Sequence, residues 1–119
     1  EVISVPCPGL AGRIERGDLA AADLREMIRG YVGSFAGTVG SVVLGCTHYP
    51  FVRTQIAEVL GGDVHFYDGG AGTARQLRHR LGECGLLADE AHAGSVSFAS
   101  SEDTPDELAL YREFFEMEL

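Results

Sequence analysis

Short apolar runs alternate with longer amphipathic stretches along the whole chain. The apolar runs are rich in Val, Ile and Phe and are bounded by Gly, Pro or polar residues, as is typical of β-strands. They lie at residues 2–5, 41–45, 64–67 and 95–98. The run at 41–45 is almost continuously apolar, which predicts a strand covered on both faces. Strands that alternate with helical stretches predict an α/β fold with a largely parallel sheet.

The stretches between these runs carry apolar residues three and four positions apart, the spacing of one helical face. We expect Asp18 to cap the first helix, and Pro50 suits the first turn of the second, where its missing N–H costs nothing. Thr104 and Glu107 have the spacing of a capping box before the last helix. The residues expected to face inward are Leu24, Met27, Ile28, Tyr31, Val32 and Phe35; Val52, Ile56, Val59 and Leu60; Ala74, Leu77 and Leu81; and Leu108, Tyr111 and Phe115.

Composition narrows the class of protein. The chain has 119 residues, of which 45% are hydrophobic and 23% charged, so it is about one domain of an ordinary globular protein. Its formal charge of −9 argues against a nucleic-acid surface, which needs clustered Lys and Arg. No apolar run approaches the roughly 20 residues of a membrane helix. Neither a signal peptide nor an initiator Met opens the chain, so we expect part of a larger protein.

The three cysteines, Cys7, Cys46 and Cys84, form neither a CxxC pair nor an even set. A disulfide framework is therefore not expected, and a reducing, cytoplasmic location is the simple inference.

The segment from Leu44 to Pro50 carries the chemistry, because it lies where a predicted strand ends and a helix begins. Ligands of open α/β sheets bind at the carboxyl ends of strands, and the N–H groups of a helix start can hold a carboxylate. A thiol at such a place, here Cys46, can exist partly as thiolate and both take and return a proton. Thr47 adds a hydroxyl, and His48 adds a group that titrates in the working range.

Other interpretations of this segment stay open on the residues alone. Cys46 could be a small packing residue, which is what most unpaired cysteines are. Cys46 and His48 are both zinc ligands, although two ligands without a nearby second pair make a weak metal signal. A nucleophilic Cys–His pair is a third interpretation. The glycine-rich turn at 68–73 is compatible with phosphate binding, but it lacks the spacing of the specific nucleotide motifs.

The segment Val43-Leu44-Gly45-Cys46-Thr47-His48-Tyr49-Pro50 resembles the second cysteine motif of the glutamate racemases, in the aspartate/glutamate racemase superfamily. Upstream, Cys7-Pro8 followed by Ile14-Glu15-Arg16-Gly17 resembles the family segment that begins with Cys-Pro and ends in an apolar residue, Glu and Gly. Downstream, Phe66-Tyr67-Asp68-Gly69-Gly70 resembles the family's third strand and turn. The order of these segments resembles the C-terminal part of a glutamate racemase.

The resemblance implies a three-layer, two-lobed α/β fold with its active site between the lobes. It implies that Cys46 exchanges a proton with one face of the substrate's α-carbon, that Thr47 holds the polar groups of the amino acid, and that His48 is the proton partner of Cys46. Glu15 matches the acid that orients this histidine. Because both motifs end predicted strands at one sheet edge, we expect these four side chains to converge. The implied reaction interconverts L- and D-glutamate for peptidoglycan without metal or organic cofactor, and the chain has no lysine to hold pyridoxal phosphate.

The chain also departs from the family's pattern. Residues 9–13 are Gly-Leu-Ala-Gly-Arg where the family is bulkier and apolar, and Gly69 stands where the family has serine. The first cysteine motif is absent, so Cys46 lacks its partner thiol, and we expect Cys7 to be a packing residue and not that partner. The implied partners are therefore glutamate and the missing N-terminal half of the same protein, with no nucleic acid and no membrane; a homodimer is compatible with these residues.

The resemblance also organises the chain into two parts. Residues 1–70 are expected to form part of the lobe that carries the second catalytic cysteine, and residues 71–119 to return to the other lobe. Two other functions stay open: a non-catalytic α/β fragment that binds a small molecule, and a related cysteine-based racemase for aspartate or another amino acid.

Overall fold

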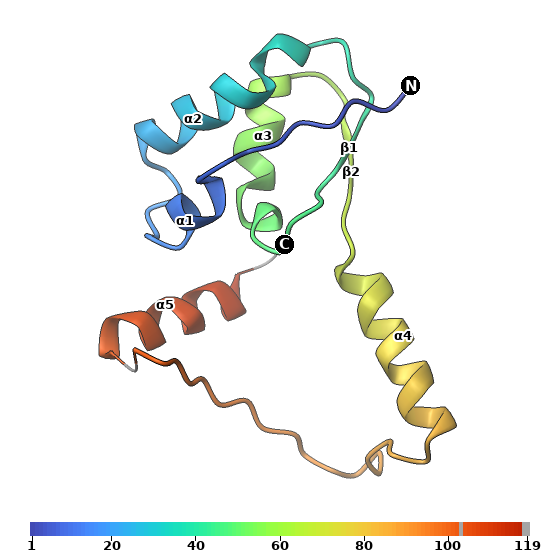
Figure 1. The fold of residues 1–119 in the computed structure, drawn as a ribbon. Coiled ribbons are helices and arrows are strands. Elements are labelled where there is room, and N and C mark those ends of the chain that lie inside the picture. Colours follow the sequence, from blue (N-terminus) through green and yellow to red (C-terminus); the bar gives the residue numbers. More distant parts are fainter. Residues whose placement is uncertain (103, 118–119) are drawn as a thin grey trace. The chain divides into compact units, whose positions relative to one another are not determined.

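The computed structural model describes residues 1–102 and 104–117 (Figure 1). They form two compact units, one from Glu1 to Asp68 and one from Gly69 to Phe115. None of the helices described there combines the length and apolarity that a bilayer-spanning segment needs.

The first unit is built on a small parallel sheet. Its strands are β1 (Ser41–Val43) and β2 (His65–Tyr67), which pair with Ser41 opposite His65 and Val43 opposite Tyr67. Both strands lie within runs that the sequence predicts as strands, and the prediction of an α/β fold with a parallel sheet is confirmed. The chain between them forms the 3-10 helix η2 (Tyr49–Val52) and helix α3 (Arg53–Leu60), which begin around Pro50 as predicted.

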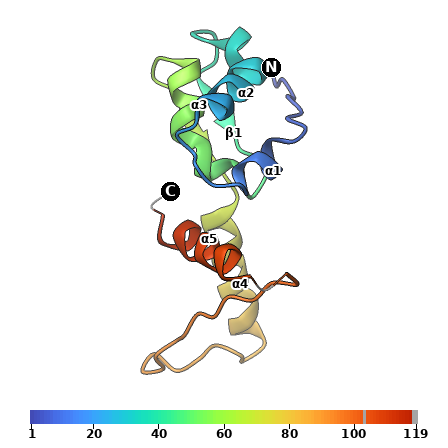
Figure 2. The ribbon, with the colours of Figure 1, turned by 90° about the vertical axis from the view of Figure 1, so that its left-hand side faces the viewer.

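Helices α1 (Leu10–Ile14) and α2 (Ala22–Val32) precede β1, and the 3-10 helix η1 (Gly33–Phe35) ends α2. Helices α2 and α3 pack side by side (Figures 1 and 2). Their apolar stripes supply half of the buried apolar side chains, and burial of apolar side chains is the main favourable term in folding. The buried apolar side chains are Leu10, Ile14, Leu24, Ile28, Leu44, Val52, Ile56 and Leu60.

Three predictions about this unit are wrong. Asp18 does not cap α2, because it adopts a left-handed conformation (φ 45°) and the helix begins later, after Ala21. Residues 2–5 are not a strand, since no neighbouring strand pairs with them in the described structure. Strand β1 is not covered on both faces, because the Val43 side chain is 76% exposed.

The second unit contains helices α4 (Gly70–Glu83) and α5 (Pro105–Glu116). Thr104 accepts a hydrogen bond from the N–H of Glu107 (3.3 Å), as predicted for a capping box, but the Glu107 carboxylate bonds Ser100 and Tyr111 instead of closing the box. The predicted strand at 95–98 is wrong, because these residues have no strand partner in the described structure; Phe98 packs edge-to-face on Phe115.

The predicted inward positions of this unit are confirmed only in part, since Leu81, Leu108 and Tyr111 are half-buried whereas Ala74, Leu77 and Phe115 are exposed. Leu77 is 59% exposed and Phe115 is 62% exposed, and neither helix has a buried residue among those described. The reason is that the described part of this unit is two helices and a long connection, which offer no second layer to cover an apolar helix face.

Candidate active site

The candidate site is the turn between the end of β1 and the start of η2, and backbone hydrogen bonds fix this turn at both ends. On the strand side, the N–H of Leu44 donates to Tyr67 O (2.8 Å), and the Leu44 side chain is buried. On the helix side, the N–H of Tyr49 donates to Cys46 O (3.2 Å) and the N–H of Phe51 donates to His48 O (3.2 Å). The three residues Cys46, Thr47 and His48 therefore share one short, doubly anchored turn.

His48 contacts neighbouring side chains through both of its ring nitrogens. Its Nδ1 atom lies 3.7 Å from Cys46 Sγ and 3.4 Å from Thr47 Oγ1. Its Nε2 atom lies 2.7 Å from Glu15 Oε1, which comes from the end of α1. A carboxylate only accepts, so Glu15 favours the tautomer with the proton on Nε2 and leaves the lone pair of Nδ1 toward the thiol.

This arrangement can move a proton between the thiol and the imidazole. If Nδ1 takes the proton of Cys46, a thiolate and an imidazolium form side by side, and the carboxylate of Glu15 stabilises the imidazolium. The His48 side chain is 30% exposed and that of Glu15 is 61% exposed. Water therefore screens the charge attraction between the two side chains. Glu15 acts on His48 more by fixing the orientation of the imidazole than by its charge. The structure thus brings together all four residues that the sequence predicts for the site.

A second thiol lies beside this turn. Cys7 is half-buried, and burial raises the pKa of its thiol; a hydrogen bond with Tyr49 acts in the opposite direction and the nearby Cys46 raises it again. Burial also raises the pKa of the Tyr49 hydroxyl, with Cys7 and Cys46 adding to the effect. Cys7 therefore keeps its proton near neutral pH, as suits the expected packing residue. The sequence gives no sign that Tyr49 contacts Cys7.

The histidine of α4 has a contact of its own and is not part of this cluster. His79 pairs with Glu83 on the exposed face of α4 (3.4 Å). Over residues 1–102 and 104–117, no group of three His, Cys, Asp or Glu side chains has an arrangement that could hold a metal ion.

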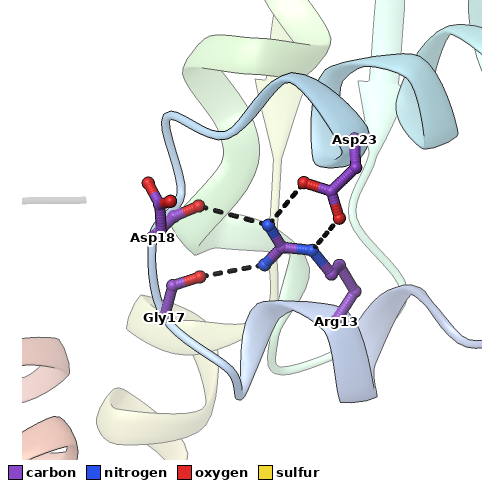
Figure 3. Close-up of polar contacts among 4 residues, drawn as sticks. All are labelled: Arg13, Gly17, Asp18 and Asp23. Carbon is purple, nitrogen blue, oxygen red and sulfur yellow. Dashed lines mark hydrogen bonds and ion pairs between the residues drawn. The ribbon is translucent and has the colours of Figure 1, made fainter.

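An ion pair that no sequence pattern indicates lies close to Glu15 in the chain, between the buried Arg13 and the exposed Asp23. Arg13, on α1, is 8% exposed and binds the Asp23 carboxylate through Nε (2.6 Å) and Nη2 (2.8 Å), as Figure 3 shows. This hydrogen bonding raises the pKa of Arg13 and lowers that of Asp23 to about 2. The signal available in the sequence is the arginine itself, one residue before the buried Ile14 in a stretch that is otherwise apolar or glycine.

Comparisons with known proteins show what the whole chain is similar to. No model of a protein family matches the chain. It is 48% identical over 104 residues to a glutamate racemase of Pseudomonas putida (strain F1), a match that covers 87% of this chain and 39% of the relative. It is 36% identical over 118 residues to a glutamate racemase of Clostridium perfringens, covering 98% of this chain and 45% of the relative.

Solved structures give the same result. The crystal structure of glutamate racemase from Francisella tularensis in complex with D-glutamate matches the whole chain with a TM-score of 0.75 and 26% identity, and the match covers 45% of that protein. The chain therefore has the α/β fold of this class of amino-acid racemases. The chain is homologous to the glutamate racemases, and it spans about two-fifths of the length of the curated relatives it matches.

Proposed function

We propose that this chain supplies one half of the active site of a glutamate racemase, with Cys46 as the acid/base thiol for one face of the substrate. The observation that carries the proposal is the contact series Cys46–His48–Glu15, in which one imidazole bridges a thiol and a carboxylate (3.7 and 2.7 Å). Homology to glutamate racemases supports glutamate as the substrate.

The proposed reaction moves one proton off the α-carbon and another onto its opposite face. The Cys46 thiolate takes the α-proton, and the electron pair of the C–H bond moves toward the substrate carboxylate. A second thiol, from the remainder of the protein, then gives its proton to the other face. His48 takes the proton of the Cys46 thiol to form the thiolate. After turnover Cys46 carries the α-proton, so the proton on His48 passes through solvent to the second thiolate and restores both thiols; Glu15 holds the imidazole in place. Thr47 binds a polar group of the amino acid. The reaction needs no organic cofactor or metal, and its product serves peptidoglycan synthesis in the cytoplasm.

An open edge of the sheet supports the proposal that further polypeptide completes this chain. Gly40 O and the N–H of Leu44 bond to β2, so the even-numbered residues of β1 face that strand. In a parallel ladder the intervening residues face the other way, so Ser41 and Val43 direct their N–H and C=O groups to the opposite edge. There the structure has an apolar groove of about 650 Å³, lined by residues 1–7, by residues 41–46 and by side chains of α2 and α3.

We infer that an extended strand from the remainder of the protein fills this groove. Val2 is 97% exposed and Ile3 is 56% exposed beside it, although both are residues that favour a buried strand. A two-stranded parallel sheet with an uncovered apolar face is rare, because parallel sheets are normally buried. The relatives have more than half of their length outside the match, which is enough chain to provide the strand.

The test follows L-glutamate in heavy water with two proteins, the longer protein that contains this chain and the chain alone. We expect the longer protein to racemise glutamate and to incorporate deuterium at the α-carbon. Cys46→Ser should lower its turnover on the order of 10³-fold, since a hydroxyl is a far weaker acid near neutral pH. Cys84→Ser is the matched control, because this thiol is exposed on the second unit.

The chain alone should not racemise glutamate and at most should exchange the α-proton of one enantiomer. Racemisation by the chain alone would contradict the division of the site between two parts. An inactive but folded longer protein, tested on glutamate, aspartate and other amino acids, would favour a non-catalytic binding protein; activity on aspartate alone would favour the related racemase.

A further inference from the structure

Arg13 is buried, and each of its three guanidinium nitrogens donates at least one hydrogen bond. Its Nη1 donates to Gly17 O (2.9 Å) and its Nη2 to Asp18 O (3.5 Å), while Nε and Nη2 hold the two oxygens of Asp23 (Figure 3). It is the one charged residue that is buried in the described part of the chain. A planar guanidinium that makes bidentate contact fixes direction as well as distance, which an ammonium does not.

The loop that Arg13 holds has an unfavourable backbone conformation. Gly17 (φ 70°) and Asp18 (φ 45°) are consecutive left-handed residues, and Asp18 is the one non-glycine residue with positive φ among those described. A left-handed conformation at a residue with a Cβ costs free energy, so it persists only where the surroundings hold it. The contacts of Arg13 with both carbonyls and with the first turn of α2 provide that hold.

Glu15 lies between Arg13 and this loop. It is the residue that follows α1, and its N–H bonds Ala11 O (3.0 Å) while its carboxylate reaches His48. The Glu15 side chain is largely exposed, so packing does not fix its direction. Helix α1 on one side and the Arg13-bound loop on the other set the position of the Glu15 backbone. That position decides whether the carboxylate meets Nε2 of His48.

We propose that Arg13, held by Asp23, is a positioning residue for the Glu15–His48 contact. The guanidinium fixes the turn from α1 to α2, and the turn fixes the backbone from which Glu15 reaches the histidine. The catalytic consequence rests on the function proposed above; the positioning itself does not.

The decisive measurement is the ¹⁵N spectrum of the His48 ring in the longer protein labelled on histidine, with the signal assigned through His48→Asn. Glu15→Gln should shift the Nε2 resonance in the wild type, because it removes the carboxylate that accepts the Nε2 proton. The same change should have much less effect in an Arg13→Met background. Arg29→Met is the control, since Arg29 is exposed and pairs with the neighbouring Glu26 (3.8 Å).

Two further variants keep the test decisive if Arg13→Met does not fold. Asp23→Asn leaves the carbonyl contacts of Arg13 but removes its bidentate partner, and Arg13→Lys keeps the charge but not the planar fork. Both should reduce the response of His48 to Glu15→Gln, and both should lower kcat about tenfold with little change in KM, since misplaced catalytic groups cost rate more than binding. A lower stability with an unchanged His48 response in all three variants would show that Arg13 only stabilises the fold. If the longer protein does not racemise glutamate, the spectrum still decides the role of Arg13.

Discussion

Glu15 Oε1 lies 2.7 Å from His48 Nε2, although 33 positions separate the two residues in the sequence. The contact joins the end of α1 to the turn after β1, so the carboxylate of the largely exposed Glu15 side chain meets the histidine beside Cys46. An imidazole that donates to a carboxylate through one nitrogen and accepts from a thiol through the other can carry a proton to and from that thiol.

Glu15→Gln should lower kcat of the longer protein about 10- to 100-fold with a smaller change in KM, because the amide keeps the shape but cannot stabilise the imidazolium. Steady-state racemisation followed by circular dichroism measures both constants. Glu58→Gln is the matched control, since Glu58 is an exposed partner of Arg25 (3.6 Å). Equal kcat values for the two variants would mean that the Glu15–His48 contact has no part in turnover.

Asp23→Asn should change how stability depends on pH. The pKa of Asp23 is about 2 in the folded chain, below its ordinary value of 3.8, because of its hydrogen bonds with Arg13. A depressed pKa contributes stability that is present above the unfolded value and is lost as the pH falls through the folded one. Wild type should therefore lose urea resistance between about pH 4 and pH 2 faster than Asp23→Asn. Because Asp23 is 67% exposed, the difference should shrink in high salt; parallel curves would contradict this assignment.

Cys46 should react with iodoacetamide near neutral pH faster than Cys7 or Cys84. His48 can accept its proton, whereas burial raises the pKa of Cys7 and makes that thiol less reactive. Mass spectrometry of labelled peptides gives the three rates separately. His48→Asn should slow Cys46 selectively, and His79→Asn, an exposed histidine on α4, should not. If Cys46 is labelled no faster than Cys84, Cys46 is a packing residue and not an acid/base thiol.

Local sequence patterns predict those parts of the fold that depend on local contacts. Strands β1 and β2 and helix α3 follow from apolar runs, from helical spacing and from Pro50. The meeting of Glu15 with His48 agrees with the expected convergence, but the reason given for it is wrong, because Glu15 follows helix α1 and residues 2–5 before that helix do not form a strand in the described structure. Residues 2–5 and 95–98 have the same strand composition, but a strand also needs a neighbour, and no local pattern contains that information.

The Arg13 contacts could not be predicted for a similar reason. They depend on the left-handed conformations of Gly17 and Asp18, which turn the chain so that Asp23 comes back to α1. The sequence predicts Asp18 as a helix cap because aspartate is favoured at the N-cap position. In the structure, its carbonyl is used by Arg13 and by the N–H of Ala21, and α2 begins after that turn.

The open edge of β1 leads to a prediction about hydrogen exchange in the longer protein. If a strand fills the groove, the amides of Ser41 and Val43 should be as protected as that of Leu44, which already donates to Tyr67 O. Residues 2–5 should gain protection too, since they line the same groove. An N–H held in a sheet ladder exchanges only when the sheet opens, so the signal is large and specific to alternate residues. Amide-resolved exchange by NMR separates Val43 from Leu44, which makes Leu44 an internal control. Fast exchange at Ser41 and Val43 beside a protected Leu44 would show that this edge stays open and that the remainder of the protein packs elsewhere.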